Sequence, residues 1–195
     1  MKESYLFLAE GFEEIEALTP VDVMRRAGMT VNTVSITSSR QVKGAHGVIV
    51  TTDLVYDPVL FTDPDWLILP GGMPGASNLY DFAPLQGLLR NHKADGGNIA
   101  AICAAPAVVL GQLGLLKGEK ATCYPGFERL CTGAEMIDAP VVVSNNLVLG
   151  NGPANALKWA LAIVAKSLGN NAKDSVATGM LLYADSGDKH DFSFG

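Results

Sequence analysis

The chain has 195 residues, of which 48% are hydrophobic and 17% charged, and its formal net charge is −6. This length suits one domain with a substantial core, so we expect a single domain over residues 1–195 with a loose tail over 185–195. The negative charge disfavours nucleic acids and anionic membranes as main partners. Apolar runs stop well short of a membrane span, no secretion signal is recognisable, and three cysteines lack zinc-site spacing. We therefore expect a cytoplasmic protein with reduced thiols.

Strand-like and helix-like segments alternate along the chain. The first strand is predicted over residues 4–9, and the first helix over 13–27 with Gly28 as its cap. Residues 37–64 are less regular, and 71–76 reads as a turn. Further strands are predicted at 29–36, 47–55, 65–70, 98–103, 120–124 and 140–152, the last as a hairpin turning at 145–146, and further helices at 83–93, 104–113, 154–168 and 172–184.

This alternation predicts an α/β fold with a mostly parallel sheet covered by helices on both sides. In such sheets, ligands bind beyond the carboxyl ends of the strands, where the strand order reverses. The rule selects the loops that follow Ala9, Pro70 and Ile102. Candidate functional residues are therefore expected in these three loops.

Cys103 lies where a predicted strand passes directly into a helix. Its neighbours Ala101, Ala104 and Ala105 are small enough for a tight strand–turn–helix junction, which lifts a nucleophile above the sheet. The N-terminus of the following helix would favour a thiolate. A buried structural cysteine is the alternative, because free cysteines are commonly buried. Position alone leaves both interpretations open.

Gly71 and Gly72 form the second loop. Two glycines after a strand let backbone N–H groups approach a ligand, and with the N–H of Ala104 they could form an oxyanion hole. An ordinary turn is the alternative interpretation.

Three glutamates, Glu13, Glu14 and Glu16, follow the first strand. The helix dipole accounts for acidic residues in a first helical turn. Pro20 cannot donate a hydrogen bond to the carbonyl of Glu16, so we expect the helix to bend there. A glutamate at this bend could point at the thiol of the neighbouring strand.

The chain has three histidines, of which only His46, in the irregular "KGAHGV", is kept as a possible site residue. His92 at a helix end and His190 in the tail are expected to be solvated.

Four stretches, "AAICAAPA", "LILPGG", "GFEEIEALTPVDVMRRAG" and "NGPANALKWALAIV", together resemble the ThiJ/PfpI superfamily, and within it the branch of Parkinson disease protein 7 and its bacterial relatives. The resemblance implies a flavodoxin-like three-layer sandwich, usually a homodimer. It makes Cys103 the reactive thiol in a strained elbow and Glu16, in neutral form, the acid that contacts the sulfur. It also implies backbone donors at Gly71, Gly72 and Ala104, and a pocket-lining loop at Gly152 and Pro153.

Two positions depart from the family pattern. Tyr124 stands where a histidine often follows the elbow helix, which argues against a Cys–His peptidase because tyrosine is a poor general base near neutral pH. His46 stands roughly where this branch often carries an anion-binding arginine, so both residues are expected to line the pocket. Cys123 could resolve an oxidised Cys103 as a disulfide, and Cys131 is expected to be structural.

The resemblance implies a cofactor-free glyoxalase or deglycase, of hydro-lyase or hydrolase type, that acts on reactive carbonyls such as methylglyoxal or its adducts. Cys103 and Glu16 would carry the reaction without a metal. A redox-sensing stress-response protein or chaperone that uses oxidation of the same cysteine is the alternative. A cysteine peptidase is the third hypothesis.

Overall fold

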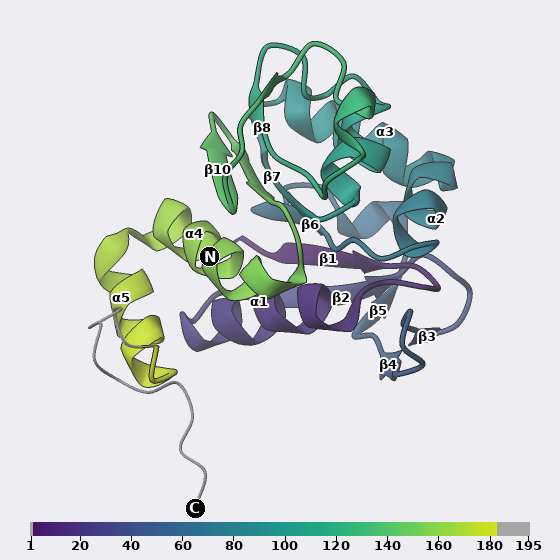
Figure 1. Cartoon of the computed structure of the whole chain (residues 1–195). Coiled ribbons are helices and arrows are strands. Elements are labelled where there is room, and N and C mark those ends of the chain that lie inside the picture. The colour runs from purple at the N-terminus through teal and green to yellow at the C-terminus, as the bar shows by residue number, and fades with distance from the viewer. Residues whose placement is uncertain (1, 183–195) are drawn as a thin grey trace, which may run out of the picture.

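A seven-stranded sheet forms the centre of the protein, for which the computed structural model describes residues 2–182 (Figure 1). The strand order is β10-β11-β7-β6-β1-β2-β5, and every neighbouring pair is parallel except β10 with β11. The mostly parallel sheet predicted from the sequence is confirmed. The strands are β1 (Ser4–Leu8), β2 (Val31–Ser35), β5 (Leu54–Val55), β6 (Trp66–Leu69), β7 (Asn98–Ile102), β10 (Val141–Ser144) and β11 (Leu147–Gly150).

Within residues 2–182, five α-helices surround the sheet: α1 (Glu14–Arg26), α2 (Gly75–Asp81), α3 (Ala83–Ala94), α4 (Ala156–Leu168) and α5 (Asn170–Gly179). None of the helices within residues 2–182 has the length and hydropathy needed to cross a membrane. The smaller elements are the pairs β3 (Gln41–Lys43) with β4 (Ile49–Thr51) and β8 (Lys120–Ala121) with β9 (Glu135–Met136), the 3₁₀ turns Pro58–Leu60, Glu128–Leu130 and Pro153–Asn155, and a π-helix at Pro106–Gly111.

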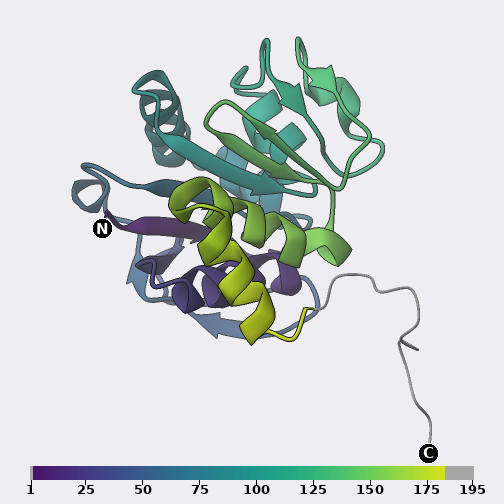
Figure 2. The ribbon, with the colours of Figure 1, turned by 90° about the vertical axis from the view of Figure 1, so that its left-hand side faces the viewer.

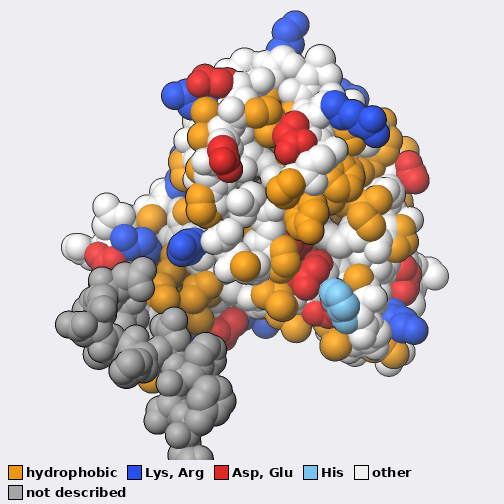
Figure 3. Space-filling model, viewed as in Figure 1, with side chains coloured by type: hydrophobic (Ala, Val, Ile, Leu, Met, Phe, Trp, Pro, Cys, Tyr) orange, Lys and Arg blue, Asp and Glu red, His pale blue; other side chains and the backbone are white. Residues whose placement is uncertain are grey.

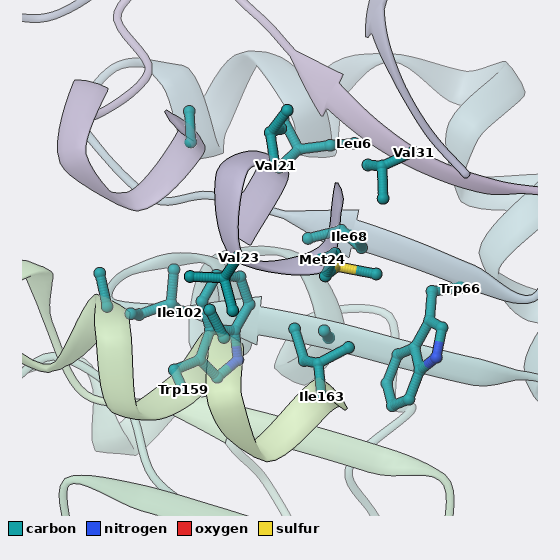
Figure 4. Packing of buried hydrophobic residues seen from close by; sticks show 14 of the residues in the cluster. Leu6, Val21, Val23, Met24, Val31, Trp66, Ile68, Ile102, Trp159 and Ile163 are labelled. Atoms are coloured by element: carbon teal, nitrogen blue, oxygen red, sulfur yellow. The ribbon is translucent and has the colours of Figure 1, made fainter. Parts of the chain in front are cut away.

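The core consists of two hydrophobic clusters, one on each face of the sheet. Alternate residues of β1 enter different clusters, Leu6 and Leu8 one of them and Tyr5 and Phe7 the other. Helices α1 and α4 cover the first face, where Figure 4 shows side chains of both helices packed against Ile68 and Ile102 of the sheet. In Figure 2, α5 lies against α4 on the same side of the molecule. Helices α2 and α3 and the segment after β7 cover the other face, which makes a three-layer sandwich.

Helix α4 packs on the sheet through a buried apolar face. Ala160, Leu161 and Val164 are buried, whereas Leu168 at the end of the helix is 39% exposed. Trp159 and Ile163 are also fully buried, and the indole N–H of Trp159 donates to the carbonyl of Val148 at 2.9 Å. This hydrogen bond anchors α4 to β11.

Several predicted boundaries were wrong. Residues 104–113 do not form an α-helix: wide turns replace it, with the N–H of Gln112 donating to Ala107, five residues back, at 3.2 Å. Residues 75–81 form α2 although two turn-forming glycines precede them, because burial of Leu79 outweighs weak local propensity. Strand β8 ends at Ala121 rather than at residue 124, and α5 ends before residue 184, which lies outside the described residues.

Candidate functional site

The three loops selected from the sequence meet at one edge of the sheet. Strands β1, β6 and β7 are parallel neighbours, so their carboxyl ends lie side by side. The strand order reverses between β1 and β6, because the chain adds β2 and β5 on one side and β7 and β11 on the other. Glu16 follows β1, Gly71 follows β6 and Cys103 follows β7, which brings them together at this reversal.

Cys103 is held in a strained backbone conformation. Its φ is 64°, in the left-handed region that costs a non-glycine residue about 1 kcal/mol or more. Its N–H donates to the carbonyl of Gly150 at 2.9 Å, and its own carbonyl accepts the N–H of Tyr124 at 2.8 Å. Both peptide groups of the elbow are therefore fixed, and the residue is 9% exposed.

Glu16 is fully buried beside this thiol. One carboxylate oxygen, Oε2, accepts the N–H of Gly71 at 2.8 Å, and the other, Oε1, has no hydrogen-bond partner within the described part of the chain. A Cβ atom on Gly71 would lie 2.7 Å from Oε2 of Glu16 and 2.7 Å from Cβ of Cys103. Only a glycine therefore fits between the carboxyl group and the cysteine.

Burial and proximity shift the pKa of both groups. Burial raises the pKa of Glu16 to about 7, against the hydrogen bonds with Cys103 and Gly71. Burial, and then the charge of the Glu16 carboxylate, raises the pKa of Cys103 to about 12, against the N–H groups of Gly72 and Ala104. The expected preference for a thiolate is therefore wrong when Glu16 is ionised, because desolvation and like charge outweigh the backbone donors. When the proton is on Glu16, the charge repulsion disappears and the carboxyl group can donate to the sulfur.

The expected backbone donors divide into two roles. The N–H groups of Gly72 and Ala104 face the sulfur of Cys103. The N–H of Gly71 is already engaged by Glu16, so it positions the acid and is not a free oxyanion donor. Gly72 has a φ of 86°, and a side chain there would collide with the backbone of residues 11–13.

Tyr124 and Gly152 lie together beside the elbow. A Cβ atom on Gly152 would lie 3.6 Å from Cδ2 of Tyr124, and Pro153 begins the 3₁₀ turn that follows. Tyr124 is 45% exposed. The expectation that these three residues line one pocket remains a prediction. The backbone N–H of Tyr124 does donate a hydrogen bond to the carbonyl of Cys103.

His46 contacts Glu14 and not the thiol. Its ring Nδ1 lies 2.8 Å from Oε2 of Glu14, and its backbone N–H donates to Oε1 at 2.8 Å. Hydrogen bonding to Glu14 raises the pKa of His46. Burial acts to raise the pKa of Glu14, but the hydrogen bonds from the His46 ring and from backbone N–H groups together lower it. Figure 3 shows acidic and histidine side chains together near the β3–β4 hairpin. The expectation that His46 lines the Cys103 pocket stays a prediction, since the contacts described for this residue are those with Glu14.

His92 was expected to be solvated, and this is wrong. It is 9% exposed, and its Nε2 lies 3.0 Å from the carbonyl of Asn98. Burial lowers its pKa. A cavity of about 650 Å³ opens beside it, near Asp65 and Phe61. This cavity lies at the amino ends of β6 and β7, the end of the sheet opposite Cys103.

Comparison with known proteins identifies the family of this chain. The family model described as DJ-1/PfpI matches residues 2–166. The chain belongs to the DJ-1/PfpI family. The oxidized DJ-1 of Toxoplasma gondii has a structure that superposes with a TM-score of 0.90 at 37% identity, covering 94% of this chain and all of that one.

Curated DJ-1/PfpI relatives include named enzymes. A deglycase of Pyrococcus horikoshii is 34% identical over 79% of this chain and 93% of its own length. A glutathione-independent glyoxalase of Caenorhabditis elegans is 35% identical over 80% of this chain and 82% of its own length. DJ-1 homolog B of Arabidopsis thaliana is 32% identical over 97% of this chain, which spans 43% of that relative.

Two functional contacts were missed from the sequence. Glu13 caps α1, since its Oε2 accepts the N–H of Glu16 at 2.7 Å and so fixes the turn that carries the acid. A glutamate is an uncommon N-cap residue, which hid this role. Cys131 lies in the same hydrophobic cluster as Cys123, and each thiol shifts the pKa of the other, although no local pattern pairs them.

Proposed function

We propose that the protein is a cofactor-free glyoxalase or deglycase that acts on reactive carbonyls such as methylglyoxal or its adducts. The observation that carries the proposal is the fully buried carboxyl group of Glu16 in contact with the thiol of Cys103. A pKa of about 7 lets Glu16 both accept and donate a proton near neutral pH. The named deglycase and glyoxalase relatives support the same chemistry.

The reaction begins when the sulfur of Cys103 attacks the aldehyde carbon of methylglyoxal while Glu16 takes the thiol proton. The N–H groups of Gly72 and Ala104 stabilise negative charge on the sulfur before the attack. Glu16 then gives this proton to the former carbonyl oxygen, which completes a neutral hemithioacetal and leaves Glu16 ionised.

A proton must then move between two carbons. Glu16, as carboxylate, removes the hydrogen of the former aldehyde carbon, and the resulting enediol takes a proton at the neighbouring carbon to give a lactoyl thioester. Water hydrolyses this thioester, the carbon–sulfur bond breaks, and the thiol returns with lactate as product. The net reaction consumes methylglyoxal and one water, so atoms and electrons balance without a further reactant.

The partner in the proposed homodimer is a second copy bound through α1 and the β3–β4 hairpin. Four apolar side chains are exposed there: Ile15 and Leu18 on α1, and Val48 and Ile49 on the hairpin. Glu14 joins the two segments, because it accepts N–H groups from residues 46 and 48. Exposed apolar side chains gathered on two joined segments are typical of a protein interface.

The test is lactate formation from methylglyoxal by the purified protein. Cys103→Ser and Glu16→Gln are both expected to lower kcat/KM at least 100-fold, because each removes a reacting group. Cys131→Ala, assayed with reductant, and the exposed Glu135→Gln are the matched controls and should retain activity. Turnover by Cys103→Ser equal to that of the native chain would exclude the mechanism.

Oxidation sensing at Cys103 is the second candidate function. Oε1 of Glu16, which has no hydrogen-bond partner among the described residues, favours it, because a protonated carboxyl group there could donate to a sulfinate oxygen. Peroxide titration of Cys103 with intact-mass readout tests it. Stable addition of two oxygen atoms to Cys103 in the native chain, but not in Glu16→Gln, supports sensing. Irreversible loss of the Cys103 thiol without a sulfinate stage contradicts it.

A further inference from the structure

Cys123 and Cys131 form a pair of buried thiols apart from the Cys103 site. Both belong to the hydrophobic cluster on the α3 face of the sheet, whereas Cys103 belongs to the cluster on the α1 face. Their thiols are near enough within this cluster for each to shift the pKa of the other. This contact raises the pKa of Cys123 and lowers that of Cys131, as expected when the S–H of Cys123 donates to the Cys131 sulfur.

The backbone holds both cysteines at fixed positions. On one side of Cys123, the N–H of Tyr124 donates to the carbonyl of Cys103 at 2.8 Å, and on the other, the hydroxyl of Thr122 donates to the carbonyl of Ala139 at 2.9 Å. Cys131 donates its N–H to Glu128 at 2.9 Å and accepts the N–H of Ala134 at 3.0 Å. The thiol contact is therefore a property of the folded chain and not of a loose loop.

Small molecules can approach this pair from outside. A surface pocket of about 230 Å³ has Cys123 in its wall, together with Thr122, Pro125, Glu128 and Met136. This volume is well above that of a water molecule, about 30 Å³, so a small hydroperoxide fits. The side chain of Cys123 is thus the part of the pair nearest to solvent.

We propose that Cys123 and Cys131 are a second redox site, which a hydroperoxide closes to an intramolecular disulfide. The thiolate of the pair attacks the terminal peroxide oxygen, which breaks the O–O bond, gives a sulfenic acid and releases an alcohol, or water from hydrogen peroxide. The second thiol attacks the sulfenic sulfur, the S–S bond forms, and water leaves. Two thiols are oxidised and one peroxide is reduced, so the step balances and does not require Cys103.

The sequence provides a clean test of this pairing. Trypsin cleaves after Lys120, Arg129 and Lys158, so Cys123 and Cys131 fall in separate peptides, 121–129 and 130–158. The Cys103→Ser chain is reduced, treated with hydrogen peroxide, alkylated and digested. We expect loss of both alkylatable thiols and a linked peptide pair that dithiothreitol separates.

A matched variant and the native chain complete the test. In Cys103→Ser combined with Cys131→Ala, the linked pair should be absent and peptide 121–129 should carry alkylation or added oxygen. Full alkylation of both peptides after peroxide, a link between two chains, or a Cys103–Cys123 link in the native protein would each overturn the proposal. Because Cys103→Ser removes the proposed catalytic thiol, the outcome is independent of the glyoxalase assay.

Discussion

Glu16→Gln should stabilise the protein at alkaline pH and have little effect at acid pH. Glutamine keeps the shape of the protonated acid and can still accept the N–H of Gly71, but it cannot ionise. The pKa of Glu16 is raised by burial from 4.5 to about 7. At 1.36 kcal/mol per pKa unit, this shift corresponds to roughly 3 kcal/mol.

The sign follows from proton binding. Below pH 4.5 the carboxyl group is protonated in both the folded and the unfolded chain, so its ionisation does not change the free energy of unfolding. Between pH 4.5 and about 7 the unfolded chain loses this proton first, and the native chain loses stability as pH rises. Above pH 7 the full cost of about 3 kcal/mol is present in the native chain and absent in the variant.

Urea unfolding under reducing conditions at several pH values between 4.5 and 8.5 measures this difference. The free energy of unfolding of Glu16→Gln minus that of the native chain should grow by about 3 kcal/mol across the range. Glu135→Gln, the same change at an exposed position, is the control and should show a nearly constant difference. A constant difference for Glu16→Gln, or one that shrinks as pH rises, would refute the argument.

Three further changes probe the site, the core and the surface. Gly71→Ala places a Cβ 2.7 Å from that of Cys103, so we expect at least a tenfold loss of kcat/KM for methylglyoxal with the fold retained by circular dichroism. Trp159→Ala removes a fully buried ring and its hydrogen bond to Val148, and should cost about 3–5 kcal/mol in urea unfolding, whereas less than 1 kcal/mol would contradict the described packing. Ile49→Lys puts a charge on a side chain that is 60% exposed, and should shift the mass in analytical ultracentrifugation from dimer to monomer with stability unchanged.

The fold was predictable because its signals are local and periodic. The strands at 4–8, 66–69 and 98–102 are short apolar runs, and the hairpin at 145–146 follows from two asparagines between β-branched segments. The segment after Cys103 was not predictable in the same way, because alanines and valines suit an α-helix and a π-helix equally well. Helix α2 was hidden for a similar reason, since burial of Leu79 decides it.

The rule about carboxyl ends of parallel strands selected the loops that carry Glu16 and Cys103, but the contact between these two side chains was implied only by the family resemblance. It depends on the close approach at Gly71 and on the cap supplied by Glu13, which are properties of the assembled sheet edge. The same holds for His46, whose bond to Glu14 spans 32 residues, and for the buried His92. Side chains that meet across loops leave no periodic signal in the sequence.

Two unfavourable features coincide at the site. Cys103 has a left-handed backbone conformation, and Glu16 has a buried carboxyl group, one oxygen of which has no hydrogen-bond partner within residues 2–182. Each destabilises the folded chain, the first by about 1 kcal/mol or more and the second by about 3 kcal/mol at alkaline pH. A glycine in place of Cys103, or a glutamine in place of Glu16, would avoid most of that cost. A purely structural role therefore explains neither the cysteine nor the glutamate. A nucleophile raised above the sheet requires the left-handed backbone at Cys103, and an acid that exchanges protons near pH 7 requires the carboxyl group of Glu16. This carboxyl group exchanges protons there only because burial raises its pKa to about 7.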